Sequence, residues 1–221
     1  GSSGFAGAPA MAANAALVSG AGLVSVITPR SIVPLVSSFC PEIMVHPANE
    51  TPYGTLTVSA VDDMRQLIDR ADVIVPGPGL GNNHETAVVV KKIIQSTKCR
   101  MVVDADALNV LGRISSSTFP NPERIILTPH PGEMARLLGK TIDEIQGDRE
   151  KAVRECAQVS GCITVLKGAG TLVASPDGNV AINLTGNPGM ATGGTGDVLA
   201  GIIGSLAAQG ISLFDAAKIS V

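Results

Sequence analysis

Short apolar segments alternate with longer helical patterns along this chain, and four of these segments run directly into a polar or glycine-rich motif. Alternation of this kind predicts right-handed crossover connections and a mainly parallel sheet covered by helices. The four motifs are Gly77–Gly81, Asp104–Asn109, Thr128–Glu133 and Lys167–Thr171. Because the carboxyl ends of parallel strands share one edge, where open α/β sheets bind ligands, the sequence predicts one long site there.

The apolar and polar patterns give approximate positions for the elements. The expected strands are residues 23–28, 71–76, 100–103, 124–127 and 163–166, with a hairpin that joins 171–175 to 180–184 around Pro176-Asp-Gly. The expected helices are residues 8–20, 31–38, 62–70, 86–95, 149–160 and 198–208. No repeat, low-complexity tract or linker interrupts this series, so we expect one domain over residues 1–221.

Composition narrows what the core and the surface can be. The chain is 45% hydrophobic but only 2% aromatic, so its core is expected to consist of Val, Ile, Leu and Ala, which suits strands buried on both faces. A net charge of −3, with one Tyr, four Phe and no Trp, argues against a nucleic-acid surface or a base-stacking platform. No apolar run is long enough for a membrane span, and no signal peptide is visible. Four cysteines without CxxC or metal-ligand spacing indicate reduced thiols in a cytosolic protein.

A glycine-rich segment, Thr192–Asp197, precedes the last of these expected helices. Free N–H groups in the first turn of a helix bind anions, and glycine allows the backbone to approach a ligand closely. Asp197 would repel a phosphate bound there, unless it takes the proton of a hydroxyl that attacks the phosphoryl group. The alternative is an aspartate that only caps the helix, and this segment alone leaves both interpretations open.

Two other motifs offer charged side chains beside a constrained backbone. Lys167-Gly-Ala-Gly-Thr supplies a cation, a flexible backbone and a hydroxyl, which suit the phosphates of a nucleotide, although Walker A spacing is absent. Prolines flank His130 on both sides and fix its backbone, which favours ligand contact. Glu133 favours the start of the next helix. The alternatives are a lysine at a hairpin end and a structural histidine.

Asp104-Ala-Asp-Ala-Leu-Asn places two carboxylates and an amide after a strand. These groups suit an ordered water or Mg²⁺, which prefers carboxylate oxygens and retains several waters. Alternatively, Asp106 caps the helix that follows. Gly77-Pro-Gly-Leu-Gly predicts a tight turn that permits close approach of a ligand.

Together these segments resemble the ADP/ATP-dependent NAD(P)H-hydrate dehydratase family, which forms the carboxy-terminal half of many bifunctional nicotinamide-nucleotide repair proteins. Thr-Pro-His-Pro-Gly-Glu with the later Gly-Gly-Thr-Gly-Asp is specific to this family, whereas Gly-Thr-Gly-Asp alone is shared with a wider kinase superfamily. The matching segments occur in the family's order across nearly the whole chain: Gly4-Phe-Ala-Gly-Ala-Pro, Gly20-Ala-Gly-Leu-Val, Gly77-Pro-Gly-Leu-Gly, Asp104-Ala-Asp-Ala-Leu-Asn, Leu127-Thr-Pro-His-Pro-Gly-Glu, Val165-Leu-Lys-Gly and Asn187-Pro-Gly-Met-Ala-Thr-Gly-Gly-Thr-Gly-Asp-Val-Leu.

The resemblance implies a three-layer αβα ribokinase-like fold, truncated at both ends because the family's first strand and final helix are missing. It implies ADP-dependent dehydration of the S-form of hydrated NADH or NADPH, with release of AMP and phosphate. ADP, or ATP, and Mg²⁺ would be the cofactors, while the metal ligands stay unassigned. It also implies a cytoplasmic homo-oligomer, a tetramer, that is fused to or works with an NAD(P)H-hydrate epimerase.

The resemblance also assigns roles to individual residues. Asp197 would be the catalytic base, and Asp104, Asn109 and Glu133 would support the site. The hydrate would be lined by Ala8, Gly81, His130 and Asp197. The nucleotide would contact Lys167, Gly168, Ala169, Gly170, Thr171, Gly194, Thr195 and Gly196.

Two other functions fit the same motifs. A vitamin or thiazole kinase of the same superfamily would release the phosphorylated alcohol as product, and Thr-Pro-His-Pro-Gly-Glu favours the dehydratase over it. A non-catalytic nucleotide sensor would keep the fold without turnover, and the presence of Asp197 and Lys167 argues against it.

Overall fold

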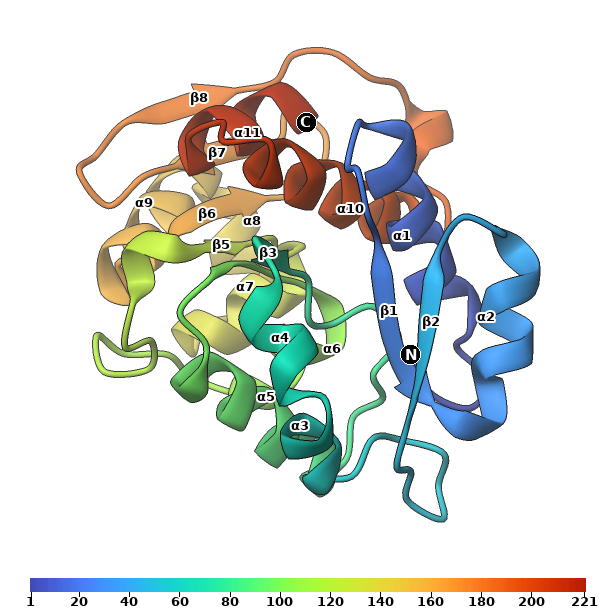
Figure 1. Cartoon of the computed structure of the whole chain (residues 1–221). Coiled ribbons are helices and arrows are strands. Elements are labelled where there is room, and N and C mark those ends of the chain that lie inside the picture. Colours follow the sequence, from blue (N-terminus) through green and yellow to red (C-terminus); the bar gives the residue numbers. More distant parts are fainter.

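The computed structural model describes residues 1–221, and Figure 1 shows a strongly twisted sheet between two layers of helices. The larger sheet consists of β3 (Val73–Ile74), β4 (Arg100–Val103), β5 (Ile125–Leu127), β6 (Ile163–Leu166), β7 (Leu172–Ala174) and β8 (Val180–Ile182). These strands neighbour one another in numerical order. The pairs from β3 to β6 are parallel and the β6-β7-β8 hairpins are antiparallel, which confirms the expected mainly parallel sheet.

One face of this sheet is covered by α10 (Thr195–Ala208) and α11 (Leu213–Ser220). Val102 and Ile126 point from the strands into a core with Ala200 and Ile203 of α10. Because side chains alternate along a strand, Met101 on the same strand as Val102 belongs to the core on the opposite face. The sheet is therefore buried on both sides.

Five helices cover the opposite face: α5 (His84–Ser96), α6 (Ala105–Leu111), α7 (Pro131–Leu138), α8 (Ile142–Gly147) and α9 (Arg149–Ser160). Met101 packs there in the largest core cluster with Val90, Leu137 and Val153, all of them fully or almost fully buried. This confirms the three-layer αβα arrangement and the aliphatic core.

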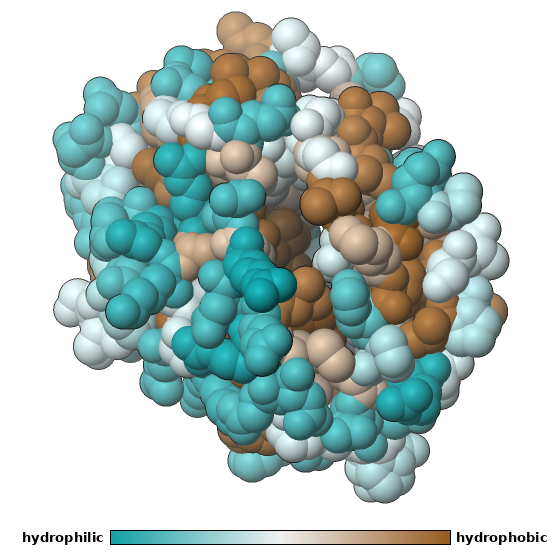
Figure 2. All heavy atoms as spheres, viewed as in Figure 1, coloured by the Kyte–Doolittle hydropathy of each residue, from teal (hydrophilic) through white to brown (hydrophobic).

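A second, two-stranded sheet lies beside the larger one and is formed by β1 (Ser25–Pro29) and β2 (Met44–Ala48), which are parallel. It packs with α1 (Gly7–Val18) and α2 (Val33–Phe39) around a core of its own that includes Val26, Val36 and Ile43. Figure 2 shows hydrophobic side chains gathered right of centre, over α1, β1 and β2. The sequence reasoning missed β2, because Pro47 and His46 interrupt the apolar pattern of this edge strand.

Two expectations differ from the structure in detail. The helix expected over 62–70 is two short helices, α3 (Ser59–Asp63) and α4 (Arg65–Arg70), which meet at Met64. The strand expected over 71–76 is paired only at the two residues of β3. Single-turn helices η1 (Arg30–Ile32), η2 (Pro122–Arg124) and η3 (Pro188–Met190) complete the chain. No helix has both the length and the apolar composition of a membrane span.

Helices α1 and α10 pack unusually closely. A Cβ atom added to Gly201 of α10 would lie 2.1 Å from the carbonyl oxygen of Ala12 in α1. Only glycine therefore allows this separation, since no side chain fits between the two backbones. The contact fixes the middle of α1 against α10.

Candidate active site

The four predicted motifs lie side by side beyond the carboxyl ends of β3, β4, β5 and β6. Backbone hydrogen bonds join neighbouring motifs: Asp104 N donates to Pro76 O at 3.2 Å, Thr128 N to Val103 O at 3.2 Å, and Lys167 N to Pro129 O at 2.9 Å. The structure thus brings together the four segments that the sequence predicts to share one edge of the sheet.

Gly77 permits the close approach of two of these segments. Its φ is +137°, and an added Cβ would lie 1.8 Å from the carbonyl oxygen of Asp104. Any other residue would collide with backbone atoms and also be strained at this φ. The tight turn predicted after β3 therefore holds the start of α6 in place.

Asp104 occupies the N-cap position of α6, but its side chain makes no capping hydrogen bond. It is 1% exposed, and its Oδ1 accepts hydrogen bonds from Lys167 Nζ at 2.7 Å and Thr128 Oγ1 at 2.8 Å. Ala105 follows with φ +46°, a conformation that costs a non-glycine residue about 1 kcal/mol. The carboxylate is thus directed across the sheet edge toward Lys167.

Asp106 does not cap α6, so that alternative is wrong. It lies in the first turn of the helix, and its Oδ2 accepts a hydrogen bond from Gly81 N at 2.9 Å. Asn109 Oδ1 accepts from Arg136 of α7 at 2.5 Å, and its Nδ2 lies 3.5 Å from Asp106 Oδ1. Asn109 therefore joins α6 to α7, and it makes no hydrogen bond to Asp104 or Lys167.

Lys167 lies between two buried carboxylates. Besides its bond to Asp104, its Nζ is 3.8 Å from Glu133 Oε2, and the lysine side chain is 19% exposed. A Cβ added to Gly196 would lie 3.4 Å from this Nζ. Lys167 is therefore not an isolated lysine at a hairpin end, because it links β4, β5 and the start of α10.

His130 and Glu133 form a reciprocal cap at the start of α7. His130 Nδ1 accepts from Gly132 N at 3.0 Å and Glu133 N at 3.4 Å, while Glu133 Oε2 accepts from His130 N at 2.8 Å. Burial and the positive charges of Lys167 and Arg136 lower the pKa of His130. The imidazole is thus neutral at pH 7, with its proton on Nε2 because Nδ1 is an acceptor. The helix-start role of Glu133 is confirmed, and His130 also has a structural role as the cap of α7.

Glu133 itself is 4% exposed. Burial raises the pKa of its carboxyl, and the Lys167 ammonium opposes that shift. Its Oε1 lies 3.5 Å from His130 Nε2, so one carboxylate contacts both the histidine and the lysine. The predicted hydrate-binding and nucleotide-binding residues therefore meet at Glu133.

Asp197 is the third residue of α10, and its carboxylate makes no hydrogen bond to the rest of the protein. The N-cap position belongs to Gly194, with φ +92° and no side-chain cap, so the capping role considered for Asp197 is wrong. Burial raises the pKa of this half-buried carboxyl, Asp104 raises it further, and Lys167 opposes the shift. An unpaired carboxyl of raised pKa, beside glycine amides, has the properties of a general base.

The segments predicted to hold the nucleotide flank the charged cluster of Asp104, Glu133 and Lys167. Thr171 Oγ1 donates to Gly168 O at 2.8 Å, which closes the loop after β6, and Gly168 and Ala169 are exposed. Thr195 Oγ1 donates to Met190 O at 2.9 Å and fixes the loop ahead of α10. Gly170 has φ +63°. Gly196 lies next to Lys167, as described above.

Ala8 and Gly81 lie on the other side of the cluster. A Cβ added to Gly79 would be 3.1 Å from Ala8 Cβ, so the first turn of α1 touches the turn after β3. Ser2 Oγ also donates to Gly79 O at 2.8 Å. Of the predicted hydrate-lining residues, Ala8 and Gly81 thus lie at this turn, whereas His130 precedes α7 and Asp197 lies at the start of α10.

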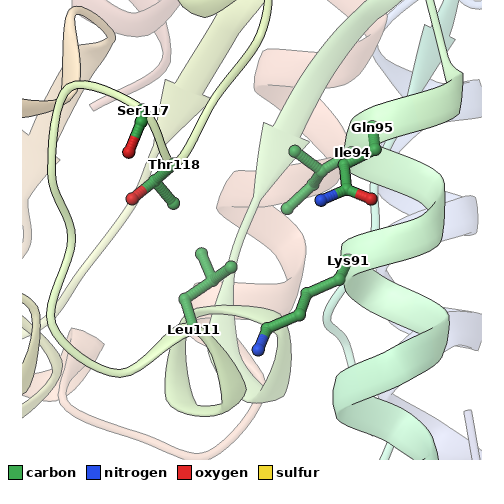
Figure 3. Close-up of a pocket in the computed structure, with 6 residues that line it drawn as sticks. All are labelled: Lys91, Ile94, Gln95, Leu111, Ser117 and Thr118. Carbon is green, nitrogen blue, oxygen red and sulfur yellow. The ribbon is translucent and has the colours of Figure 1, made fainter.

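Two cavities lie elsewhere. One, of about 280 Å³, lies between α5, α6 and the segment after α6, where Lys91 and Gln95 project from α5 and Leu111 and Thr118 lie opposite (Figure 3). The other, of about 820 Å³, lies at the amino ends of the strands and includes Arg100. Neither cavity is lined by a residue of the four motifs, so neither is the candidate active site.

Comparison with known proteins places these features in a family. A model of the NAD(P)H-hydrate dehydratase family matches residues 1–221. The chain is 46% identical to the bifunctional NAD(P)H-hydrate repair enzyme Nnr of Moorella thermoacetica, over 96% of the chain but 40% of that protein. It is 41% identical to the ADP-dependent (S)-NAD(P)H-hydrate dehydratase of Neisseria meningitidis, over 98% of the chain and 70% of that protein.

A solved structure gives the same result for the fold. The chain is similar to the ADP/ATP-dependent NAD(P)H-hydrate dehydratase of Bacillus subtilis co-crystallised with ATP and Mg²⁺, with a TM-score of 0.80 and 29% identity, covering 100% of this chain and 76% of that one. The chain therefore spans about 40% of the length of the bifunctional relative and about three quarters of the single-function ones.

Proposed function

Because this chain belongs to the NAD(P)H-hydrate dehydratase family, we propose that it catalyses the ADP-dependent dehydration of the S-form of hydrated NADH and NADPH, with ATP as an alternative donor. The observation that carries this proposal is the position of Asp197. Its carboxyl has no hydrogen-bond partner, lies at the start of α10, and is close enough to Asp104 and Lys167 for their charges to shift its pKa.

In the first step, the C6 hydroxyl oxygen of the hydrated ring forms a bond to the β-phosphorus of ADP. The bond from that phosphorus to the bridging oxygen breaks, and AMP leaves with the electron pair. Asp197 takes the hydroxyl proton, while the amides at Gly194 and Gly196 stabilise the charge on the transferring group. A raised pKa suits Asp197 to this task, since a base is most effective when its pKa lies near the working pH.

In the second step, the C6–O bond breaks and inorganic phosphate leaves. Phosphate is a far better leaving group than hydroxide, which explains why a dehydration consumes a nucleotide. The neighbouring ring carbon then loses a proton, and the double bond of NADH or NADPH is restored. The neutral His130, Ala8 and Gly81 line the hydrate in this proposal, and Lys167 with Gly168 to Thr171 holds the nucleotide.

Mg²⁺ fits this site through Asp104. The Oδ2 atom of Asp104 makes no hydrogen bond and would lie 3.9 Å from a Cβ on Gly196, so it opens toward the start of α10. No group of three or more His, Cys, Asp and Glu side chains is placed to hold a metal. This suits Mg²⁺, which typically keeps several waters and takes one or two carboxylates with substrate phosphates. When bound, it would neutralise phosphate charge.

We also propose the wider setting that the resemblance implies: a cytoplasmic homotetramer that is fused to, or works with, an epimerase of the hydrates. Four free cysteines, three of them buried, suit a reducing compartment. Exposed Leu35 and Phe39 on α2 and Val18 on α1 would be covered by subunit contacts. Light scattering coupled to size exclusion measures the oligomeric state directly.

The decisive experiment is one assay. Purified protein is mixed with hydrated NADH, Mg²⁺ and either ADP or ATP, and the return of NADH absorbance is followed. We expect absorbance to recover with release of AMP and phosphate in the ADP reaction. A stable phosphorylated product without recovery would identify a small-molecule kinase instead, and tight nucleotide binding without turnover would identify a sensor.

A further inference from the structure

We propose that Arg149 is a further nucleotide-binding residue, whose guanidinium binds a phosphate of ADP or ATP at the loop Lys167–Thr171. This inference rests on the proposed function, because it takes that loop to be the nucleotide site. Arg149 comes 18 residues before Lys167 in the sequence and begins a different element, α9.

The first support is contact with the loop itself. Arg149 NH2 donates to Leu166 O at 3.2 Å and to Lys167 O at 3.4 Å, and NH1 donates to Gln146 Oε1 at 3.0 Å. A guanidinium has five N–H donors, so Nε–H and the second N–H of NH1 have no protein partner. The side chain is thus held against the loop, and two of its N–H groups stay free to bind a ligand.

The second support is the residue that faces the guanidinium. Gly168 has φ +141°, and a Cβ there would lie 3.1 Å from both terminal nitrogens of Arg149. The absence of a side chain lets the guanidinium lie against the loop backbone. Gly168 and Ala169 are exposed, so a ligand that reaches this backbone from solvent comes within reach of Arg149.

The third support is the balance of charge. Lys167 is already paired with Asp104 at 2.7 Å and lies 3.8 Å from Glu133. Its charge is therefore opposed by two buried carboxylates before any phosphate binds. A nucleoside diphosphate adds further negative charge, and Arg149 is the other cation in contact with this loop. A guanidinium fork also matches the geometry of phosphate oxygens in a way that an ammonium does not.

The fourth support is the position of Arg149 in its helix. It is the first residue of α9, where the positive end of the helix dipole disfavours a cation. The helix start does not depend on it, because Asp148 caps α9 by accepting from Lys151 N at 2.9 Å. An anion bound beside Arg149 would offset this local repulsion.

The test is titration calorimetry with ADP and Mg²⁺ on the whole protein. We expect Arg149→Gln to raise the Kd for ADP by about 10- to 100-fold, since it removes hydrogen bonds to a charged group. We expect Arg149→Lys, which keeps the charge but loses the guanidinium fork, to raise the Kd for ADP by a smaller factor than Arg149→Gln.

Arg154→Gln is the matched control. Arg154 lies on the same helix, pairs with Glu150 at 2.7 Å and donates to Gly178 O at 2.5 Å in the turn between β7 and β8, so its loss is expected to leave the Kd unchanged. In the dehydration assay, Arg149→Gln should raise the KM for ADP by a similar factor and leave the KM for the hydrate unchanged. A purely structural role would alter both KM values and kcat together.

An Arg149→Gln protein that binds ADP within twofold of the wild type would overturn the inference. The proposed function can fail separately: wild-type protein that binds ADP but never restores NADH absorbance would refute dehydration. The loss of ADP affinity in Arg149→Gln would still support this residue's role in that case.

Discussion

Lys167 Nζ lies 2.7 Å from Asp104 Oδ1, although the two residues follow β6 and β4 and the whole of β5 separates those strands. The pair joins the segments after these two strands, and Thr128 of the intervening segment donates to the same oxygen. Breaking it affects the loops after three strands at once.

We expect Asp104→Asn to lower the free energy of unfolding by about 3 kcal/mol, near the lower end of the range for a broken buried pair, because the Lys167 side chain is 19% exposed. Chemical denaturation measures this. The control is Asp62→Asn, which breaks the exposed pair of Asp62 with Lys92 and should cost less than about 1 kcal/mol. Equal losses in the two variants would contradict the importance of the buried pair.

Asp197→Asn should lower kcat by about 10²- to 10⁴-fold, the usual contribution of a positioned acid or base. Its affinity for ADP should stay within about threefold of the wild type by calorimetry, because the glycine amides of α10 are unchanged and an amide repels phosphate less than a carboxylate. Turnover near the wild-type rate would remove Asp197 from the role of base.

The same substitution predicts a pH dependence of stability. The pKa of Asp197 is raised above 3.8 in the folded protein, so the folded state holds this proton more tightly than the unfolded state. The stability contribution is therefore fully present below about pH 3.8 and is lost as pH rises through the folded pKa. We expect the Tm of Asp197→Asn to gain on that of the wild type as the pH rises from about 3.8 through the folded pKa, and the gap to stay constant at higher pH. A gap that is independent of pH would contradict the shifted pKa.

His130 can be tested with two variants that separate its roles. His130→Ala removes the cap of α7 and should cost about 1 kcal/mol of stability, whereas His130→Asn keeps a capping acceptor and should cost little. Both should raise the KM for the hydrate by about tenfold or more while the Kd for ADP changes less, because the imidazole is lost in both. A normal hydrate KM in the asparagine variant would leave His130 as a cap alone.

Gly77→Ala should destabilise the protein by about 3 kcal/mol or more, because the new methyl group would collide with Asp104 O and the backbone would be strained at φ +137°. Gly147→Ala is the control, since a Cβ at that helical position meets nothing within 4 Å; its stability should be unchanged or slightly higher. Thermal unfolding of the two variants under one condition measures the difference, and similar Tm values would contradict the close approach.

Local pattern predicted most of the elements. Residues 149–160 and 163–166 were expected as a helix and a strand, and α9 and β6 have those bounds, since a polar–apolar helical period followed by β-branched residues is a strong local signal. The strand β2 was missed because proline and histidine weaken its apolar pattern. The break at Met64 was missed because nothing in the local sequence marks it.

The site was only partly predictable. The motifs can be recognised because polar residues and glycines follow the expected strands directly. Their shared edge follows because those strands are parallel. The pairing of Lys167 with Asp104 does not, because it depends on the spatial order of three strands. Sequence spacing also favoured Asp106 as a helix cap, whereas tertiary contact with Gly81 determines its position. Arg149 carried no signal, since an arginine at the start of a helix is ordinarily a solvated side chain.

The close packing of α1 against α10 at Gly201 limits how this scaffold can be redesigned. Ala8 is the second residue of α1 and Asp197 the third of α10, so the proposed base and one proposed wall of the hydrate site lie on two helices that pack directly against each other. Enlarging the side chains of α1 that face α10 would therefore displace Asp197, the proposed base, as well. Altered specificity is therefore more accessible at positions outside α1 and away from the glycines, such as Gly77, that these close contacts require.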